Sequence, residues 1–169
     1  MIFTHHRIVL FAMFFALLLT SNKTINAQEV LNETATAKIV PTNFYFAGQS
    51  APTQMRNSAA ARLAKDRFVI AGLVDTSGYS TEISGKYEGF FITDSIVTVG
   101  GKQLPTGAYG FGFSADGKLR VFDLSSKEVL TVGTTNDKEM KRPRPLMMML
   151  AEGGVRFYKG KNYTLIKAK

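Results

Sequence analysis

Few side chains in this sequence are suited to chemistry. Both histidines, His5 and His6, lie at the beginning of the chain, and cysteine and tryptophan are absent. Once a leader of 27 residues is removed, as argued below, no imidazole or thiol remains. This excludes Ser-His-Asp and Cys-His nucleophiles, zinc sites built on His or Cys, and a histidine proton shuttle. Carboxylates, lysines, tyrosines and hydroxyls are the groups left for catalysis.

Three acidic residues, Glu88, Asp94 and Asp123, are candidates for carboxylate chemistry. Two carboxyl groups and a water suffice to hydrolyse a glycosidic bond when the groups face each other at about 5 to 10 Å. A carboxylate-based hydrolase acting on polysaccharide is therefore the enzymatic alternative. The sequence does not say whether any two of these acids converge, so no catalytic residue is assigned and we lean towards a protein without enzymatic activity.

A basic segment, KEMKRPR, occupies residues 138–144 and contains Lys138, Lys141, Arg142 and Arg144. Two prolines within and after the segment stiffen it, and arginine can bind phosphate or carboxylate with two parallel hydrogen bonds. These four residues are our candidate anion-binding site. The other interpretation is a solvated connection, whose charges repel one another and keep the edge soluble.

Three further patterns have structural explanations that we prefer. The VDTSG stretch at residues 74–78 resembles the Asp-Thr-Gly turn of aspartic proteases, but its spacing is broken and no second copy exists. Met147, Met148 and Met149 offer thioethers to copper(I), but neighbouring strand residues alternate faces and cannot all reach one ion. Exposed tyrosines that could stack on sugar rings are the last pattern, and half-buried packing is the alternative for them. The tyrosines considered are Tyr79, Tyr158 and Tyr163. We therefore expect no metal site and no cofactor.

The beginning of the chain has the three regions of a signal peptide in order. Residues 1–7 carry His5, His6 and Arg7, residues 8–19 are wholly apolar, and residues 20–27 turn polar. The apolar run is shorter than the roughly twenty residues of a spanning helix, although an uncleaved anchor remains the alternative. Cleavage between Ala27 and Gln28 predicts an exported protein in the periplasm or outside the cell.

Removal of this leader leaves a basic domain. The chain has 21 basic and 13 acidic residues, and two of the basic ones, Arg7 and Lys23, lie in the leader, so about six positive charges remain in excess. Such a balance favours encounter with anionic partners, for example an anionic polymer or surface of the cell envelope. Nucleic acid is not expected as a partner of an exported chain, and no span is expected after processing.

The rest of the chain reads as short strands separated by turn residues. We expect an irregular N-terminal arm over residues 28–57, with an aromatic group at residues 44–46, and a single β-domain over residues 58–169; residues 58–65 fit a short helix or a strand. Strands are predicted at residues 67–74, 86–93, 95–99, 107–114, 118–124, 128–134, 146–151, 155–159 and 162–167. Spacing of roughly ten residues, with no long helical segment, predicts an all-β fold, an antiparallel sandwich or small barrel of about 7 to 9 strands. The strongest local signal is the Asp116–Gly117 pair between two strands, which predicts a hairpin.

The segment GAYGFGFS at residues 107–114 has two unlike faces. Tyr109, Phe111 and Phe113 alternate with Ala108, Gly110 and Gly112, so a strand here turns its rings to one side and its glycines to the other. We expect the aromatic face to fill the core. The glycine face indicates either a strongly bent strand or the close approach of another backbone or a ligand.

Several short segments of the sequence resemble segments of a known group of proteins. VGGKQLPTGAYGFGF at residues 99–113, KRPRPL at residues 141–146 and RFYKGKNYTL at residues 156–165 are similar to phrases in small secreted bacterial proteins of unknown function. The resemblance implies a small β-domain in or outside the cell envelope and brings no activity, ligand or site residue. Combined with the basic loop, it leads us to expect a non-catalytic binding or envelope-associated module for an anionic ligand. The alternatives are the hydrolase and a structural or assembly subunit.

Overall fold

The computed structural model describes residues 28–169, so the expected signal peptide and Ala27 of its expected cleavage site lie outside the described residues. Within this range the strands divide between an eight-stranded and a six-stranded sheet, and every pairing is antiparallel. The expected all-β fold is confirmed, and the sandwich is the architecture present. The described chain has more strands than the 7 to 9 expected, because several strands are only two to four residues long.

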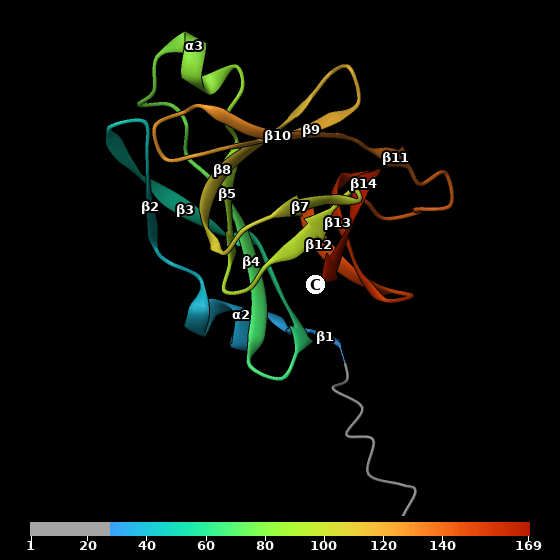
Figure 1. The fold of residues 1–169 in the computed structure, drawn as a ribbon. Coiled ribbons are helices and arrows are strands. Elements are labelled where there is room, and N and C mark those ends of the chain that lie inside the picture. Colours follow the sequence, from blue (N-terminus) through green and yellow to red (C-terminus); the bar gives the residue numbers. More distant parts are fainter. Residues whose placement is uncertain (1–27) are drawn as a thin grey trace, which may run out of the picture.

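The two sheets lie face to face: in Figure 1 sheet 1 extends from β2 and β3 on the left to β9 and β10 at the top, and β12, β13 and β14 of sheet 2 lie on the right. Sheet 1 has the order β1-β3-β4-β5-β8-β9-β10, with β2 paired to β3, and sheet 2 has the order β12-β13-β14-β6-β7, with β11 paired to β14. Sheet 1 consists of β1 (Glu29–Val30), β2 (Asn43–Phe46), β3 (Gln49–Ala64), β4 (Arg67–Val74), β5 (Gly89–Thr93), β8 (Gly107–Ser114), β9 (Lys118–Phe122) and β10 (Glu128–Gly133). Sheet 2 consists of β6 (Val97–Val99), β7 (Lys102–Leu104), β11 (Thr135–Asn136), β12 (Arg144–Ala151), β13 (Gly154–Gly160) and β14 (Asn162–Ala168). The helices are α2 (Glu33–Ile39) and α3 (Thr81–Ser84).

The segment expected as an irregular arm, residues 28–57, is in fact regular over most of its length. It carries β1, α2, β2 and the first half of β3, and residues 58–65, left open between helix and strand, continue β3 as far as Ala64. Asn32 begins α2 by accepting a hydrogen bond from the Ala35 N–H at 2.9 Å. The helix ends before Pro41, whose ring disfavours helical backbone in the residue that precedes it.

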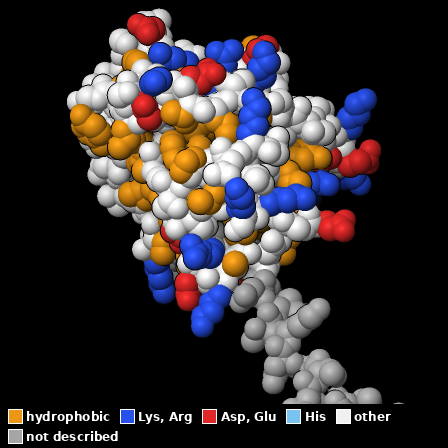
Figure 2. All heavy atoms as spheres, viewed as in Figure 1, with side chains coloured by type: hydrophobic (Ala, Val, Ile, Leu, Met, Phe, Trp, Pro, Cys, Tyr) orange, Lys and Arg blue, Asp and Glu red, His pale blue; other side chains and the backbone are white. Residues whose placement is uncertain are grey.

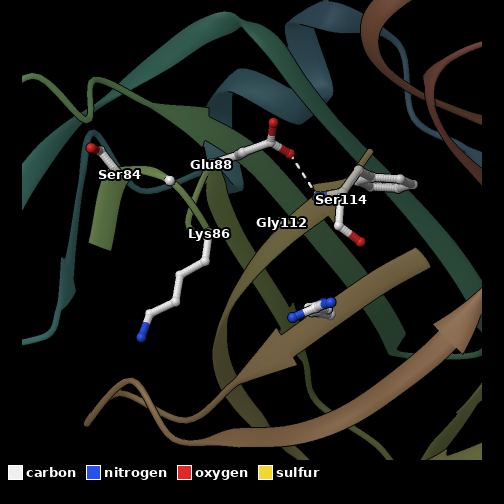
Figure 3. Close-up of a pocket in the computed structure, with 8 residues that line it drawn as sticks. Ser84, Lys86, Glu88, Gly112 and Ser114 are labelled. Atoms are coloured by element: carbon white, nitrogen blue, oxygen red, sulfur yellow. Dashed lines mark hydrogen bonds between the residues drawn. The ribbon is translucent and has the colours of Figure 1, made fainter. Parts of the chain in front are cut away.

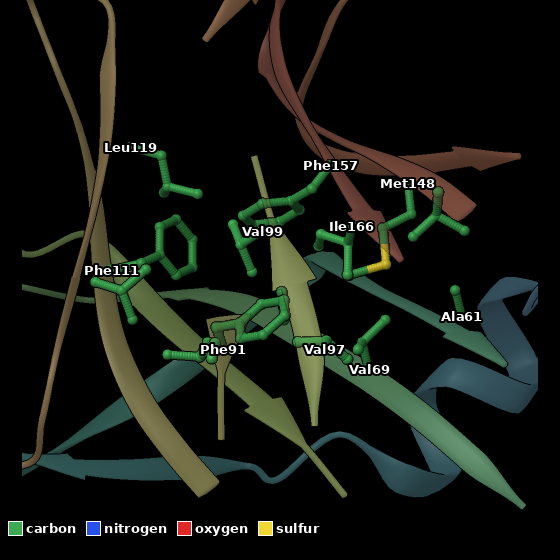
Figure 4. Close-up of a cluster of buried hydrophobic side chains, with 14 of the residues drawn as sticks. Ala61, Val69, Phe91, Val97, Val99, Phe111, Leu119, Met148, Phe157 and Ile166 are labelled. Atoms are coloured by element: carbon green, nitrogen blue, oxygen red, sulfur yellow. The ribbon is translucent and has the colours of Figure 1, made fainter. Parts of the chain in front are cut away.

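The main core lies between the two sheets, as Figure 4 shows. Phe111 of β8 and Phe157 of β13 meet edge to face at a centroid distance of 5.3 Å, and Phe91 of β5 lies 5.8 Å from the same Phe157 ring. Each such ring contributes about 1.5–3 kcal/mol by leaving water. Met148 is buried in this core, while Met149 beside it is 40% exposed. Neighbouring methionines of β12 therefore point to opposite faces of the sheet, as the argument against a copper site built on all three required.

A second apolar cluster covers the outer face of sheet 1. Phe46 of β2 stacks on Tyr87 at 4.0 Å, and both rings are fully buried. Gly110 of β8 makes room for them, because a Cβ at this position would lie 2.3 Å from the Phe46 ring. The glycine face of β8 therefore accommodates packing from its own chain. At Gly112 the neighbour is backbone, since a Cβ there would lie 2.0 Å from the Lys86 carbonyl oxygen.

The hairpin predicted at Asp116 and Gly117 is confirmed. Strands β8 and β9 pair with Ser114 opposite Lys118, and Gly117 has a φ of +75°, which suits a residue without a Cβ. Strands β4 and β8 have the bounds predicted from the sequence. Among residues 28–169, no helix has the length and apolar character needed to cross a bilayer.

Candidate functional site

All of the basic segment except Arg144, the first residue of β12, lies in the loop that connects β11 to β12. Both ends of the loop are attached to the β13–β14 hairpin, because Asn136 pairs with Asn162 and Arg144 pairs with Gly160. The Asp137 N–H also donates to the Lys161 carbonyl at 2.9 Å. Residues 137–143 are therefore held at both ends, and they bring Lys161 at the hairpin tip close to the basic segment.

Asp137 anchors the loop through its carboxylate. Its Oδ2 accepts a hydrogen bond from the Tyr158 hydroxyl at 2.7 Å and lies 3.7 Å from the Arg156 guanidinium, while its Oδ1 accepts from the Glu139 N–H at 3.1 Å. Tyr158 is fully buried, and the Arg156 guanidinium lies 4.7 Å from the centroid of the Tyr163 ring. These contacts pin the loop to the outer face of sheet 2. We call residues 137, 156, 158 and 163 the loop anchor.

The ionisation of the anchor favours this arrangement. Burial raises the pKa of Tyr158 above its usual 10.0, so the phenol keeps the proton that it donates to Asp137. The hydrogen bond to Tyr158 raises the pKa of Arg156, which is a permanent cation in any case. Tyr158 therefore remains a hydrogen-bond donor, and Arg156 a cation, through the neutral pH range.

The four cations of the candidate site separate into two groups. Lys138, Lys141 and Arg142 are exposed and make no ion pair within residues 28–169. Arg144 instead lies 2.9 Å from Glu33 of α2. Figure 2 shows both basic and acidic side chains at the right-hand edge of the molecule, where the loop after β11 projects in Figure 1. We call the three unpaired residues the basic loop cations.

An open groove of about 550 Å³ lies next to the attachment of this loop. One wall is the tip of the β13–β14 hairpin with Lys159, Lys161 and Asn162, together with Pro145, and the other is the β8–β9 turn around Ser114. The Lys159 ammonium pairs with Glu88, which connects the ends of the two sheets. Burial lowers the pKa of Lys159. No carboxylate lines the groove, so its charged lining is basic.

A smaller hollow of about 170 Å³ lies on the other side of Glu88 and is drawn in Figure 3. Ser84 and Lys86 precede β5, Gly112 and Ser114 belong to β8, and the Lys86 side chain extends away from Glu88. The Glu88 Oε2 accepts from the Phe113 N–H at 2.8 Å. With this bond and the pair to Lys159, the carboxylate joins β8 to sheet 2.

The remaining candidate acids are also occupied by local structure. Asp94 accepts two hydrogen bonds from the Phe68 N–H, at 2.8 and 2.9 Å. Asp123 accepts from the Ser125 hydroxyl at 2.7 Å and from the Ser125 and Lys127 N–H groups. These bonds, the one from the Ser125 hydroxyl first, lower the pKa of Asp123 and hold the turn after β9. The groove has no carboxylate in its lining, and the smaller hollow has one, that of Glu88. The arrangement offers no facing pair of carboxylates at these two places.

Two sequence patterns are also explained by packing. Asp75 of the VDTSG stretch accepts from the Ser77 N–H at 3.0 Å, which makes it a turn residue with a lowered pKa. Tyr79 and Tyr158 are buried, so the expectation that they are exposed was wrong, while Tyr163 is partly exposed. Among the described residues no three His, Cys, Asp or Glu side chains gather as metal ligands.

The loop anchor was not found by reading the sequence. Asp137 and Tyr158 are 21 residues apart, and Glu88 and Lys159 are 71 apart. No local pattern marks either pair, because each depends on how strands distant in sequence pair and stack. The Gly-Lys-Asn turn that carries Lys161 is visible in the sequence, but its attachment to the basic loop is not.

Fold and site together define a two-sheet β-domain with a basic loop fixed at one end of sheet 2. Comparison with known proteins finds no matching family model, no matching curated protein and no matching solved structure. The resemblance to small secreted bacterial proteins therefore stays a prediction from the shared phrases.

Proposed function

We propose that this protein is a non-catalytic binding module for an anionic ligand, which it contacts through Lys138, Lys141 and Arg142. The observation that carries the proposal is that these three cations are exposed, lack acidic partners in residues 28–169, and belong to a loop fixed at both ends. A fixed loop loses less conformational entropy on binding than a mobile one. Glu139 is the single acidic residue among positions 138–143, so the segment keeps a positive balance.

The groove beside the loop extends the basic surface. Lys159 and Lys161 line it, and Lys161 is joined to Asp137 through the backbone. A ligand with several anionic groups could contact the loop and the hairpin tip together, whereas a single small anion would use one of them. This supports an extended polyanion, such as an envelope polymer bearing phosphate or carboxylate groups, as the ligand.

Retention on a phosphocellulose matrix tests this proposal. Replacing Lys138, Lys141 and Arg142 by Ala should lower the salt concentration at which the protein elutes, because exposed charges act over about one Debye length. The matched control replaces Lys65, Arg67 and Lys127, three exposed cations elsewhere, and changes the net charge equally. Its elution should stay closer to that of the wild type. Equal elution of the two triple variants would mean that net charge alone determines retention and would refute the loop as a site.

We also propose that the protein is exported after cleavage between Ala27 and Gln28, and that it belongs with the small secreted bacterial β-domain proteins that its phrases resemble. The order of basic, apolar and polar regions in residues 1–27 supports export. The N-terminus of the protein purified from its native cells should begin at Gln28 or, after cyclisation, at its pyroglutamate. An intact Met1 on the purified protein would contradict cleavage.

A further inference from the structure

A third hollow, of about 210 Å³, lies between α2, β3 and the beginning of β12. Arg56 of β3 and Arg144 of β12 both line it, Glu33 of α2 stands beside them, and Met55 and Ala37 contribute apolar surface. The basic loop cations are not part of its lining. We call this hollow the arginine cleft.

Arg56 lies on a large β-bulge. The pairing of β3 with β4 passes from Thr53 opposite Val74 to Ser58 opposite Gly72, so residues 54–57 face the single residue 73. The bulge has its own hydrogen bonds. These are Gln54 Nε2 to the Val74 carbonyl at 3.1 Å, Asn57 Nδ2 to Gln54 Oε1 at 2.8 Å, and Ser58 Oγ to the Met55 carbonyl at 2.6 Å. These bonds define the shape of the bulge that carries Arg56.

Arg144 also lies next to a bulge. The pairing of β12 with β13 passes from Arg144 opposite Gly160 to Met147 opposite Tyr158, so residues 145 and 146 face the single residue 159. Bulges bend a strand and change the direction of its side chains, and they occur often beside binding sites. Two independent bulges therefore bring two arginines to one cleft.

The charges of the cleft are not balanced. Arg144 lies 2.9 Å from the Glu33 carboxylate, with side chains that are 56% and 86% exposed. Ion pairs this exposed are weak and exchange readily with solvent. Arg56 has no ion pair within the described part of the chain. The cleft thus holds two guanidinium groups but a single carboxylate, which pairs loosely with Arg144 alone.

We propose that the arginine cleft is a second binding site, for a small organic anion that carries a carboxylate or phosphate monoester on a short apolar group. The anionic oxygens bind Arg56 and Arg144, which can each present two parallel donors. The apolar group lies against Met55 and Ala37, and Glu33 is released to solvent. The small volume suits a ligand of this size and not a polymer, which separates this site from the basic loop.

The probes for the test are phenyl phosphate and hexanoate, titrated into ¹⁵N-labelled wild-type protein and followed by backbone amide shifts. We expect saturable shifts in α2 and in residues 54–58 with at least one probe, and weaker shifts with inorganic phosphate, which lacks the apolar group. The two probes distinguish phosphate from carboxylate recognition. The absence of saturation with both probes up to about 10 mM would overturn the proposal.

Three variants assign the binding to the cleft. Arg56→Gln should weaken the probe that binds by about tenfold or more, because a charge-assisted hydrogen bond is lost. Glu33→Gln should strengthen binding severalfold, because the competing carboxylate is removed. Arg67→Gln, which changes an exposed arginine outside the cleft, should have no effect. Equal affinities of the Arg56 and Arg67 variants would overturn the proposal.

The triple variant of the basic loop cations separates the two sites. If the cleft is an independent site, this variant binds the probe with wild-type affinity even when its retention on phosphocellulose is reduced. Loss of probe binding in the triple variant would assign the small anion to the loop and refute the cleft. Normal probe binding together with unchanged retention would refute the loop and leave the cleft supported.

Discussion

Replacing Tyr158 by Phe removes one hydroxyl from the loop anchor and little else. Tyr158 is fully buried, and its ring remains as Phe, so no large cavity forms. The hydroxyl donates to Asp137 at 2.7 Å and accepts from Arg156 at 3.4 Å. In the variant, the Asp137 carboxylate loses its O–H donor and keeps the Arg156 guanidinium at 3.7 Å and the N–H of Glu139.

The expected loss of stability follows from these contacts. A hydrogen bond to a charged group contributes about 1.5–3 kcal/mol, and more is lost when a buried partner stays unsatisfied. The Asp137 side chain is 17% exposed and retains two partners, so the lower end of this range applies. We expect the free energy of unfolding of Tyr158→Phe to be lower by about 1.5 kcal/mol, roughly a tenfold change in the unfolding equilibrium constant.

Urea denaturation followed by circular dichroism measures this difference, with Tyr163→Phe as the matched control. The Tyr163 ring lies 5.0 Å from that of Tyr158, but its hydroxyl makes no hydrogen bond within residues 28–169, so this variant should stay within about 0.5 kcal/mol of the wild type. Limited proteolysis reports on the loop itself. Trypsin should cleave after Lys138 and Lys141 faster in Tyr158→Phe, because the anchor holds the loop closed to the protease.

The same variant has a defined pH dependence. The folded pKa of Tyr158 is raised above its unfolded value of 10.0 by burial. Its contribution to stability is therefore complete below pH 10 and is lost as pH rises towards the folded pKa. The gap between wild type and Tyr158→Phe should shrink above pH 10. Equal stability of the two phenylalanine variants at pH 7, with equal cleavage of the loop, would refute the anchor.

Two further predictions concern glycine packing and a surface carboxylate. Gly110→Ala should lower the free energy of unfolding by about 1–3 kcal/mol, because its Cβ would lie 2.3 Å from the Phe46 ring. Gly133→Ala, which meets open space, should stay within about 1 kcal/mol of the wild type, and equal losses in thermal or urea unfolding would contradict the packing. The Asp116 carboxyl should titrate by NMR with a midpoint at about 2, because hydrogen bonds from Lys118 and Ser114 lower its pKa from 3.8. The contribution of the ionised Asp116 to stability is present above pH 3.8 and is lost as pH falls through about 2. If the midpoint stays low in Lys118→Ala, the hydrogen bond from Lys118 is not the cause of the lowered pKa.

The sequence was informative wherever the structure depends on neighbours along the chain. The two-residue periodicity of residues 107–114 predicted which side of β8 faces the core, and the Asp-Gly pair predicted the turn that follows. The bounds of β4 were predicted for the same reason, since apolar residues ended by a turn cluster are a local signal. Strands of two or three residues, such as β7 and β11, carry too few residues for any periodicity and were missed.

The N-terminal segment shows where local signals fail. Pro41 and Pro52 suggested an irregular arm, yet β2 begins two residues after Pro41, and Pro52 lies within β3 opposite Asn43. Proline lacks an N–H but is tolerated on a strand whose N–H is not needed by the ladder. The burial of Phe44 and Phe46 on sheet 1 stabilises this pairing, and this tertiary contact has no counterpart in the local sequence.

The candidate site was predicted in composition but not in geometry. Lys138, Lys141, Arg142 and Arg144 are neighbours in the chain, and their shared charge suggested one site. The register of β12 against β13 directs Arg144 to α2, while the anchor at Asp137 holds the others over sheet 2. Sequence proximity therefore grouped residues that the fold divides between two surfaces.

The two sheets are covered on their outer faces in different ways, and this difference explains how sheet 2 carries exposed cations. Sheet 1 is covered by stacked aromatic rings such as Phe46 and Tyr87, whose contacts are apolar and close-packed. Sheet 2 is covered in part by the loop of residues 137–143, held by a carboxylate, a phenol and a guanidinium. An apolar cover is stable because it excludes water. The polar anchor instead gives the buried Tyr158 hydroxyl a hydrogen-bond partner, and it leaves the cations of the loop in solvent. The loop over sheet 2 can therefore present unpaired cations to solvent without weakening the core.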